Sequence, residues 1–143
     1  MPQGDGAAAG IDQCRVDREL PLPGERNGSS REVFCDKLSS LQNTKFELAA
    51  CATEAQAGQA LLDKALAEHE SGGLSAADAA MVKLFCTEMQ GRVLDRCLQL
   101  FGGYGYVLDY PIARAYTDAR VSRIYAGSSE VMKTIVSKSM GVS

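Results

Sequence analysis

The sequence lacks several features that mark large classes of proteins. Its formal net charge is -3, so it has no basic excess of the kind that nucleic-acid-binding domains usually carry. No apolar run approaches the roughly 18 to 20 residues that a membrane-spanning helix requires. The N-terminus has neither a hydrophobic signal core nor an Arg-rich, acid-poor transit composition. We therefore expect a cytoplasmic protein that binds no nucleic acid and does not span a membrane.

Cysteine is present but never in a C-x-x-C pair, which excludes the simplest zinc and redox-dithiol motifs. The five cysteines are widely spaced, at Cys14, Cys35, Cys51, Cys86 and Cys97. The last three fall within helical patterns, where free cysteine commonly packs as a small hydrophobic residue. We therefore favour buried, reduced thiols over reactive ones and expect no metal site.

Strand-like alternation and internal repeats are also absent, and helical periodicity dominates after the first thirty residues. Residues 1–30 are rich in glycine and proline without a sustained period, which indicates a mostly disordered or loosely attached segment. Residues 31–143 are predicted to form one helical domain. Helices are expected from about residue 39 to Gly72-Gly73, over 76–101, over 112–123, and from Gly127-Ser128 to about residue 138. The fold class is all-α.

The apolar stripes of the two long predicted helices indicate how they pack. In the first helix the stripe runs through Leu41, Leu48, Ala52, Ala55, Leu62 and Leu66. The second helix has two stripes, one of Val82, Phe85, Met89, Val93 and Leu100 and another of Leu94, Cys97 and Phe101. Two apolar faces on one helix predict two packing partners. Ser75 and Asp78 form a capping-box-like start to the second helix.

Residues 99–118 read QLFGGYGYVLDYPIARAYTD and give the most specific signal in the chain. A glycine C-cap explains Gly102 alone, but it does not explain the spacing of Gln99, Gly102-Gly103, Gly105-Tyr106 and Asp109. This spacing resembles the C-terminal signature of the acyl-CoA dehydrogenases, flavoenzymes that desaturate acyl thioesters. The resemblance runs from Arg31 to about Met140, through REVFCDKLSSLQNTKF and RIYAGSSEVMKTIV.

The resemblance implies a particular architecture and cofactor. Members of the family have an α-helical N-terminal domain, a β middle domain and a C-terminal four-helix bundle, and FAD lies between domains and across a subunit interface. The chain resembles only the last part, with one helix missing. We therefore expect a truncated chain, an incomplete up-and-down four-helix bundle that contacts FAD, acyl-CoA and either itself or related subunits as an oligomer.

The resemblance assigns FAD contacts at the start of the domain. Arg31 and Phe34 form the family's R-x-x-F motif, although Cys35 replaces the glycine that usually follows. A planar guanidinium can donate two hydrogen bonds to a phosphate, whereas the alternative for Arg31 is a solvated side chain. Gln42 falls where the family has another FAD contact.

The resemblance also places FAD contacts in the glycine-rich segment, at Gln99, Gly102 and Gly103. Backbone lacking a Cβ can approach a ligand closely, and in the family this segment reaches FAD bound mainly by another subunit. The alternative for Gln99 is an exposed helical side chain. A valine at Gly103 is expected to disturb both the FAD contact and helix termination, because β-branched residues tolerate positive φ poorly.

The segment YAGSSE, residues 125–130, occupies the position where many family members carry a glutamate that removes the α-proton. This chain has Ala126 there, which cannot accept a proton, but its backbone N–H can donate to the thioester oxygen. The resemblance assigns FAD contacts to Ser128, Ser129 and Glu130. For the serines, capping of the following helix is the alternative.

Family members of the long-chain and isovaleryl types take the base from an earlier helix that begins with a pattern like LPxER. The chain contains LPGER at residues 22–26, which makes Glu25 a candidate base. Only four residues separate this motif from Arg31, whereas several helical turns separate them in the family. The alternative is a solvated glutamate in a flexible tail.

Two classes of function follow. The first is the C-terminal domain of an FAD-dependent acyl-CoA dehydrogenase, inactive without the other domains. The second is a catalytically silent helical module that associates with full-length subunits or with itself, because missing partners leave apolar faces exposed. A truncated gene product without a present role is a further alternative.

Overall fold

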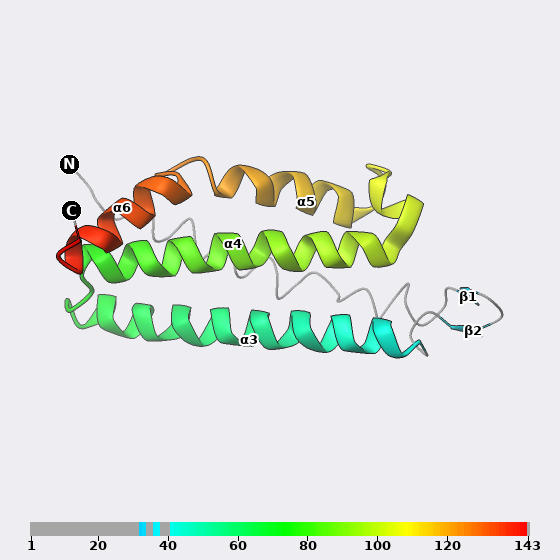
Figure 1. The fold of residues 1–143 in the computed structure, drawn as a ribbon, viewed down its shortest axis with the longest axis horizontal. Coiled ribbons are helices and arrows are strands. Elements are labelled where there is room, and N and C mark those ends of the chain that lie inside the picture. Colours follow the sequence, from blue (N-terminus) through cyan, green and yellow to red (C-terminus); the bar gives the residue numbers. More distant parts are fainter. Residues whose placement is uncertain (1–31, 34–35, 38–40, 143) are drawn as a thin grey trace.

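The computed structural model describes residues 32–33, 36–37 and 41–142 and is dominated by four helices (Figure 1). The helices are α3 (Gln42–Glu70), α4 (Ala76–Phe101), α5 (Pro111–Ser122) and α6 (Ser129–Ser139), and a 3-10 helix, η2 (Gly102–Tyr106), follows α4. The antiparallel pair β1 (Glu32–Val33) and β2 (Asp36–Lys37) is the only sheet among the described residues. The predicted all-α class and the four helices are confirmed. The interpretation of residues 1–30 lies outside the described part.

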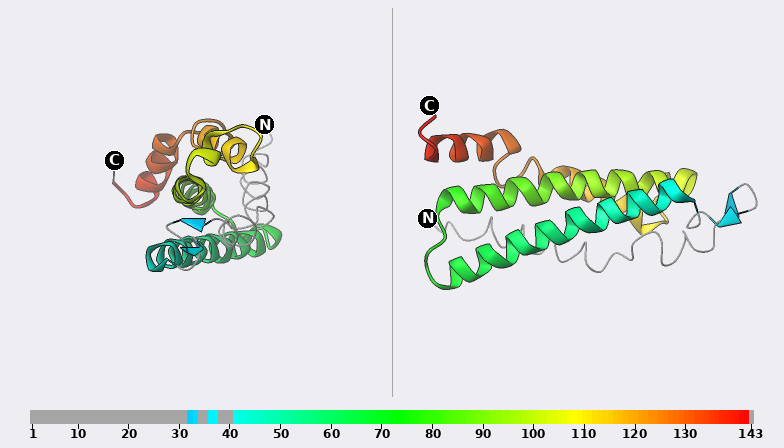
Figure 2. Two further views of the ribbon diagram at one scale, coloured as in Figure 1. Left: turned by 90° about the vertical axis from the view of Figure 1, so that its right-hand side faces the viewer. Right: turned by 60° about the horizontal axis from the view of Figure 1, so that its bottom comes forward.

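α4 is the central element of the fold. It packs against α3 on one side and against α5 and α6 on the other. Figures 1 and 2 show α5 and α6 following one another along α4, so that together they act as one long antiparallel partner. The two packing partners predicted for α4 are thus confirmed, and the arrangement is the expected incomplete up-and-down bundle. Within the described residues, no helix combines the length and apolar character needed to cross a bilayer.

The seam between α3 and α4 differs from the predicted apolar stripe. Leu41 and Ala52 are exposed, and the buried positions of α3 are Thr44, Cys51, Gly58, Leu62 and Ala65. Small residues dominate because the two helices approach closely. A Cβ on Gly58 would lie only 2.6 Å from Cε of Met89. The seam therefore follows the positions where backbones can come together rather than the positions with the largest side chains.

The core forms where α3, α4 and α5 meet. Its buried members are Cys51, Leu94, Cys97, Ile112 and Ala119, and a second cluster joins Leu62 to Cys86 between α3 and α4. Cys51, Cys86 and Cys97 are buried free thiols, as predicted; Cys14 and Cys35 lie outside the described residues. Burial raises the pKa of the Cys51 thiol, although the nearby Arg96 opposes this shift.

Glycine and serine set the helix ends. The Ser75 hydroxyl accepts a hydrogen bond from the Asp78 N–H at 3.1 Å, which confirms the predicted cap. α3 ends before Gly72, at φ +74°, and α4 ends at Gly102, with φ 59° and ψ -138°. The positive φ that the sequence analysis attributed to Gly103 therefore belongs to Gly102. The prediction that Gly103 terminates the helix is wrong, because Gly102 already makes the turn.

A network of partly buried ion pairs joins α3 to α4. Glu54 accepts hydrogen bonds from Arg92 Nε at 3.0 Å and from Arg96 Nη1 at 2.7 Å. Burial alone would raise the pKa of Glu54, but the hydrogen bonds and charges of the two arginines outweigh it, and the pKa lies below its usual value. Glu54 therefore favours the folded state when it is ionised.

We expect the Glu54→Gln variant to lose about 1 kcal/mol of unfolding free energy at pH 7. A carboxyl whose folded pKa is depressed contributes stability above its unfolded pKa, and this contribution disappears as pH falls through the folded pKa. The difference from the parent should therefore shrink as the pH falls. Urea denaturation of the parent and of the variant at pH 7 and at about pH 3 measures this difference in unfolding free energy. Glu68→Gln, which removes only an exposed i,i+4 pair with Lys64, is the control, and an equal loss in both variants would contradict the prediction.

Candidate functional site

One group of predicted site residues lies at a single end of the bundle. Gln42 is the first residue of α3, Gln99 lies in the last turn of α4, and Gly102 and Gly103 begin η2. Because α3 and α4 are antiparallel, these segments meet at the same end (Figure 1). Both glutamines are exposed, and a Cβ on Gly103 would meet no atom within 4 Å. This end offers amide groups and open backbone to a ligand.

Three other predicted residues, Glu25, Arg31 and Phe34, lie outside the described part of the chain. The remaining predicted site residues lie where α5 is joined to α6. Ala126 is in the turn between the two helices, and Ser128, Ser129 and Glu130 follow it at the start of α6. This turn packs against the middle of α4 rather than against its end.

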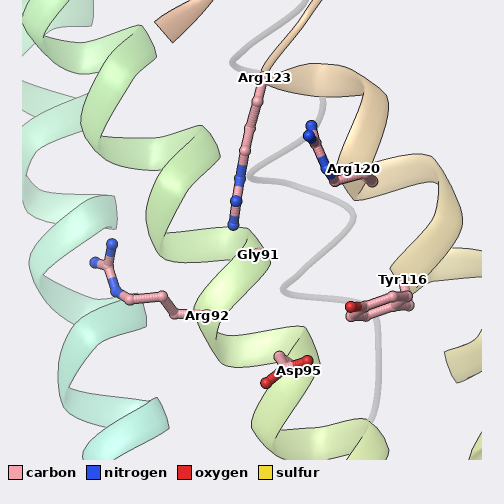
Figure 3. A pocket seen from close by; sticks show the side chains of 6 residues that line it. All are labelled: Gly91, Arg92, Asp95, Tyr116, Arg120 and Arg123. Atoms are coloured by element: carbon pink, nitrogen blue, oxygen red, sulfur yellow. The ribbon is translucent and has the colours of Figure 1, made fainter.

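Arg123 anchors the start of the turn on α4. Figure 3 shows its side chain extending from the end of α5 to the α4 backbone at Gly91. A Cβ on Gly91 would lie 1.6 Å from Arg123 Nη2, so the guanidinium occupies the space that any larger residue would need. Its Nε lies 3.5 Å from Glu88 Oε2. Gly91 and Glu88 together fix where the chain leaves α5.

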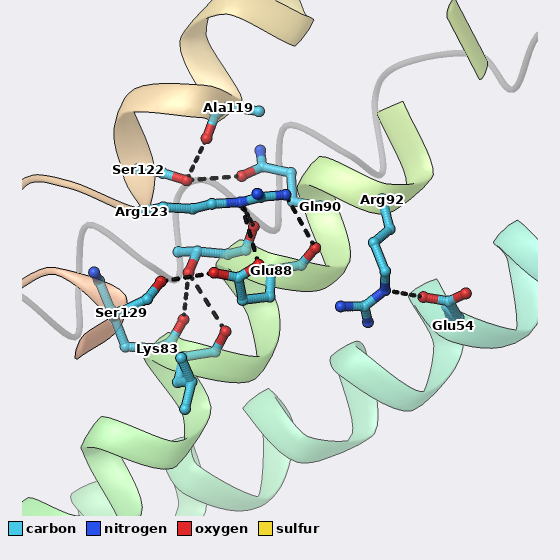
Figure 4. A network of polar contacts seen from close by, with 11 residues as sticks. Glu54, Lys83, Glu88, Gln90, Arg92, Ala119, Ser122, Arg123 and Ser129 are labelled. Atoms are coloured by element: carbon cyan, nitrogen blue, oxygen red, sulfur yellow. Dashed lines mark hydrogen bonds and ion pairs between the residues drawn. The ribbon is translucent and has the colours of Figure 1, made fainter. Parts of the chain in front are cut away.

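The far side of the turn is held by two further contacts, and Figure 4 shows the one between Ser129 and Glu88. Lys83 Nζ donates to the Gly127 carbonyl, and Ser129 Oγ donates to Glu88 Oε1 at 2.7 Å. Lys83 is buried, and burial lowers its pKa, while the Glu88 charge opposes the shift. Glu88 thus binds both Arg123 before the turn and Ser129 after it. The turn is clamped to α4 on both sides.

Ala126 has an unusual backbone conformation within this clamped turn. Its φ is 53°, the only positive φ of a non-glycine residue in the described ranges, and Gly127 follows at φ 95°. The left-handed conformation costs an L-residue about 1–2 kcal/mol, and such strain persists where the surroundings fix it. Ala126 is exposed, and none of the hydrogen bonds identified among the described residues uses its N–H. This N–H is free to donate to a ligand.

The residues after the turn have distinct environments. Ser128 occupies the N-cap position of α6, but its side chain makes no capping hydrogen bond. The backbone N–H of Glu130 and the Ser128 hydroxyl instead lower the pKa of the Glu130 carboxyl, which is exposed. Ser129 is buried, and its hydroxyl is directed to Glu88. Of the two roles considered for Ser128, capping is therefore not observed.

The two groups of site residues are well separated along α4. The turn contacts Glu88, whereas Gln99 is near the helix end. At about 1.5 Å per residue this separation is roughly 17 Å. A single molecule that touched both would have to be extended.

Sequence reasoning missed the residues that hold the turn, namely Lys83, Glu88, Gly91 and Arg123. One signal was available, because an isolated glycine inside a long helical pattern usually has a packing reason. Gly91 is such a residue, and its reason is the approach of Arg123. The charged residues gave no local sign of their role.

Comparison with known proteins places this geometry in a family. The family model described as "Acyl-CoA dehydrogenase, C-terminal domain" matches residues 28–141. The chain is 39% identical over 108 residues to the mitochondrial long-chain specific acyl-CoA dehydrogenase of Rattus norvegicus, which covers 76% of this chain and 25% of the relative. It is 34% identical over 136 residues to the acryloyl-CoA reductase (NADH) of Anaerotignum propionicum, covering 94% of the chain and 33% of the relative.

The fold comparison agrees. The crystal structure of an acyl-CoA dehydrogenase from Geobacillus kaustophilus superposes with a TM-score of 0.84 and 37% identity, over 94% of this chain and 35% of that one. The chain therefore spans between a quarter and about a third of the length of these proteins. The match lies in their helical C-terminal part. The chain thus belongs to the acyl-CoA dehydrogenase family and corresponds to the C-terminal domain of its members.

Proposed function

We propose that the chain serves as the C-terminal part of an FAD-dependent enzyme that desaturates acyl-CoA thioesters between the α- and β-carbons. The observation that carries this proposal is the clamped left-handed turn at Ala126 and Gly127. The sequence resemblance assigns the catalytic base of many family members to the position of Ala126. Strained backbone of this kind is concentrated at functional sites. In the proposed reaction a base removes the α-proton, and bound FAD would accept a hydride from the β-carbon.

The role of the turn is to position one hydrogen-bond donor. The exposed Ala126 N–H would donate to the thioester carbonyl oxygen and stabilise the negative charge that develops as the α-proton leaves. Lys83, Glu88 and Arg123 would keep this donor in place before substrate arrives. Alanine has no group that accepts a proton, so the base must come from another position. Glu25 is the candidate within this chain.

The opposite end of the bundle would contact FAD. Exposed amides at Gln42 and Gln99 and the open backbone at Gly103 suit a polar, extended dinucleotide. Arg31 and Phe34 would complete this set. In the family the glycine-rich segment reaches FAD that another subunit holds, so the proposal includes a homo-oligomer or association with related subunits. The cytoplasmic location remains a prediction.

A fusion experiment tests the proposal. The chain would be joined to the N-terminal and β domains of a relative such as the Geobacillus kaustophilus enzyme. We expect the fusion to bind FAD and the chain alone to show no turnover with FAD, acyl-CoA and an electron acceptor. Gln99→Ala should weaken FAD binding about fivefold, because one amide hydrogen bond is lost. Flavin fluorescence measures the affinity.

The matched control for this experiment is Gln56→Ala, which removes an exposed glutamine in the middle of α3. Equal effects of the two substitutions would remove Gln99 from the flavin site. Turnover by the chain alone would show that the other domains are dispensable and would overturn that part of the proposal.

The second candidate function is a catalytically silent association module. It is favoured by large apolar side chains that remain exposed, including Phe46 at 61%, Leu108 at 67% and Ile124 at 58%. Exposed apolar surface of this kind often marks contact with other proteins. A correctly folded fusion that binds neither FAD nor acyl-CoA would favour this function over the first.

A further inference from the structure

A pocket of about 270 Å³ lies between α4 and α5, next to the clamped turn but separate from the Ala126 N–H. It is lined by Gly91, Arg92, Asp95, Tyr116, Arg120 and Arg123. Figure 3 shows Arg120, Arg123, Tyr116 and Asp95 on the side of α4 that faces α5, whereas the Arg92 side chain points toward α3, where it pairs with Glu54. The volume is slightly below the usual range for small-molecule sites, so the pocket suits a compact ligand.

Three of the lining residues are arginines, and their charges are compensated unequally. Arg92 pairs with Glu54 at 3.0 Å, and Arg123 pairs with Glu88 at 3.5 Å. Arg120 takes part in none of the ion pairs found among the described residues, although its charge acts on the exposed Glu130 carboxylate and Asp95 lines the same pocket. The pocket therefore contains a guanidinium whose donors are available.

The position of Arg120 makes an anion favourable. It lies three residues before Arg123 on the last turn of α5, and like charges at this spacing on a helix repel each other. Because Glu88 already pairs with Arg123, an anion in the pocket would mainly be attracted to Arg120. The planar guanidinium can give two parallel hydrogen bonds to the oxygens of a carboxylate or phosphate.

Tyr116 and Asp95 define the other end of the pocket. Figure 3 shows the Tyr116 ring and the Asp95 carboxylate away from the two α5 guanidiniums. The Asp95 charge repels an anion, so it both limits the affinity and directs the anion toward the arginines.

We propose that the α4–α5 pocket binds a compact oxyanion, the phosphate or carboxylate group of a small solute, with Arg120 as its principal ligand. The pocket residues do not include Ala126, nor do they include Gln42 or Gln99 at the end of the bundle. The proposal therefore does not depend on flavin binding or on acyl-CoA chemistry.

Titration of the complete chain with inorganic phosphate tests the proposal. Ionic strength would be held constant by replacing sodium chloride with sodium phosphate, and a parallel titration would use acetate. We expect saturable shifts of the backbone amide signals of Gly91, Asp95, Tyr116 and Arg120 in nuclear magnetic resonance spectra. Saturation by phosphate or by acetate at these residues supports the proposal and identifies which oxyanion is preferred.

Substitutions that remove a positive or a negative charge from the pocket test whether the anion binds there. Arg120→Gln should weaken binding about tenfold, because it removes a charge-assisted hydrogen bond. Lys45→Gln removes the same charge from an exposed site on α3 and should change the affinity little. Asp95→Asn should tighten binding severalfold, because it removes the repelling charge. Tyr116→Phe should change the affinity little, because Tyr116 lies at the end of the pocket away from the guanidiniums.

Two results would overturn the proposal. One is an absence of saturable shifts with both phosphate and acetate at constant ionic strength. The other is binding that Arg120→Gln weakens no more than Lys45→Gln does, since this would mean that only the overall charge matters. Circular dichroism of each variant confirms that the helices are intact. Because neither FAD nor acyl-CoA is present, failure here would leave the proposed function unaffected.

Discussion

Replacing Leu94 by alanine is expected to lower the free energy of unfolding by about 2–5 kcal/mol. Leu94 is 4% exposed and belongs to the core cluster in which Cys51 of α3 and Ile112 of α5 also lie. Truncation removes apolar contacts and leaves a cavity between helices that are already held by the ion pairs of Glu54. Such surroundings cannot close around the missing side chain without breaking other contacts.

Urea denaturation of the complete chain followed by circular dichroism measures this loss. Val121→Ala is the control, because Val121 is on α5 but is 48% exposed, and it should cost less than about 1 kcal/mol. If Leu94→Ala cost no more than Val121→Ala, the junction of the three helices would not be the stabilising core. A smaller slope of the transition would show that the variant loses compactness as well.

The helix pattern of the sequence was sufficient for most of the fold. The two apolar stripes of α4 correctly predicted partners on two sides, because a long helix with large apolar residues gives a strong periodic signal. The α3 seam was predicted only in part, because Leu62 is buried and Leu66 packs beside it, whereas Leu41 and Ala52 are exposed. Its buried positions include Thr44 and Gly58, which contribute little hydrophobicity and are buried because they allow close approach. Periodicity detects large side chains and overlooks such positions.

The candidate site was predictable only in part, because its contacts join residues that are far apart in the sequence. The YAGSSE segment could be located from its resemblance to a family motif. The clamp could not, because Lys83 and Gly127 are 44 residues apart, and Glu88 and Ser129 are 41 residues apart. A buried lysine in the middle of a helix also runs against the usual preference for the surface. Local patterns contain no information about such pairs.

The contacts of the clamp do not depend on the side chain at position 126, where the sequence resemblance predicts a carboxylate in many family members. These contacts use the carbonyl of Gly127, the hydroxyl of Ser129 and the guanidinium of Arg123. None of them involves the side chain at position 126. The strained backbone is therefore maintained whichever side chain is present there, and the position can be changed without dismantling the turn.

The largest functional effect is expected from Ala126→Glu in the fusion with the N-terminal and β domains of a relative. A positioned base typically contributes 10²- to 10⁴-fold to proton transfer, and we expect exchange of the α-proton of bound acyl-CoA to rise toward that range. Alanine already has a Cβ in the left-handed conformation, so the longer side chain adds little backbone strain. The positive charges of Lys83 and Arg123 near the turn would help to keep the introduced carboxylate ionised.

Deuterium incorporation at the α-carbon, followed by mass spectrometry, measures this exchange. Ala126→Gln is the matched control, because it has a similar size but no basic group, and it should leave exchange at the level of the parent fusion. Glu25→Gln in the same fusion tests whether the N-terminal segment supplies a base. If the parent fusion exchanges rapidly, loses exchange with Glu25→Gln and gains nothing from Ala126→Glu, the chemistry is not located at the clamped turn. Proton removal would then belong to the LPGER segment, and the turn would only orient the thioester through its N–H.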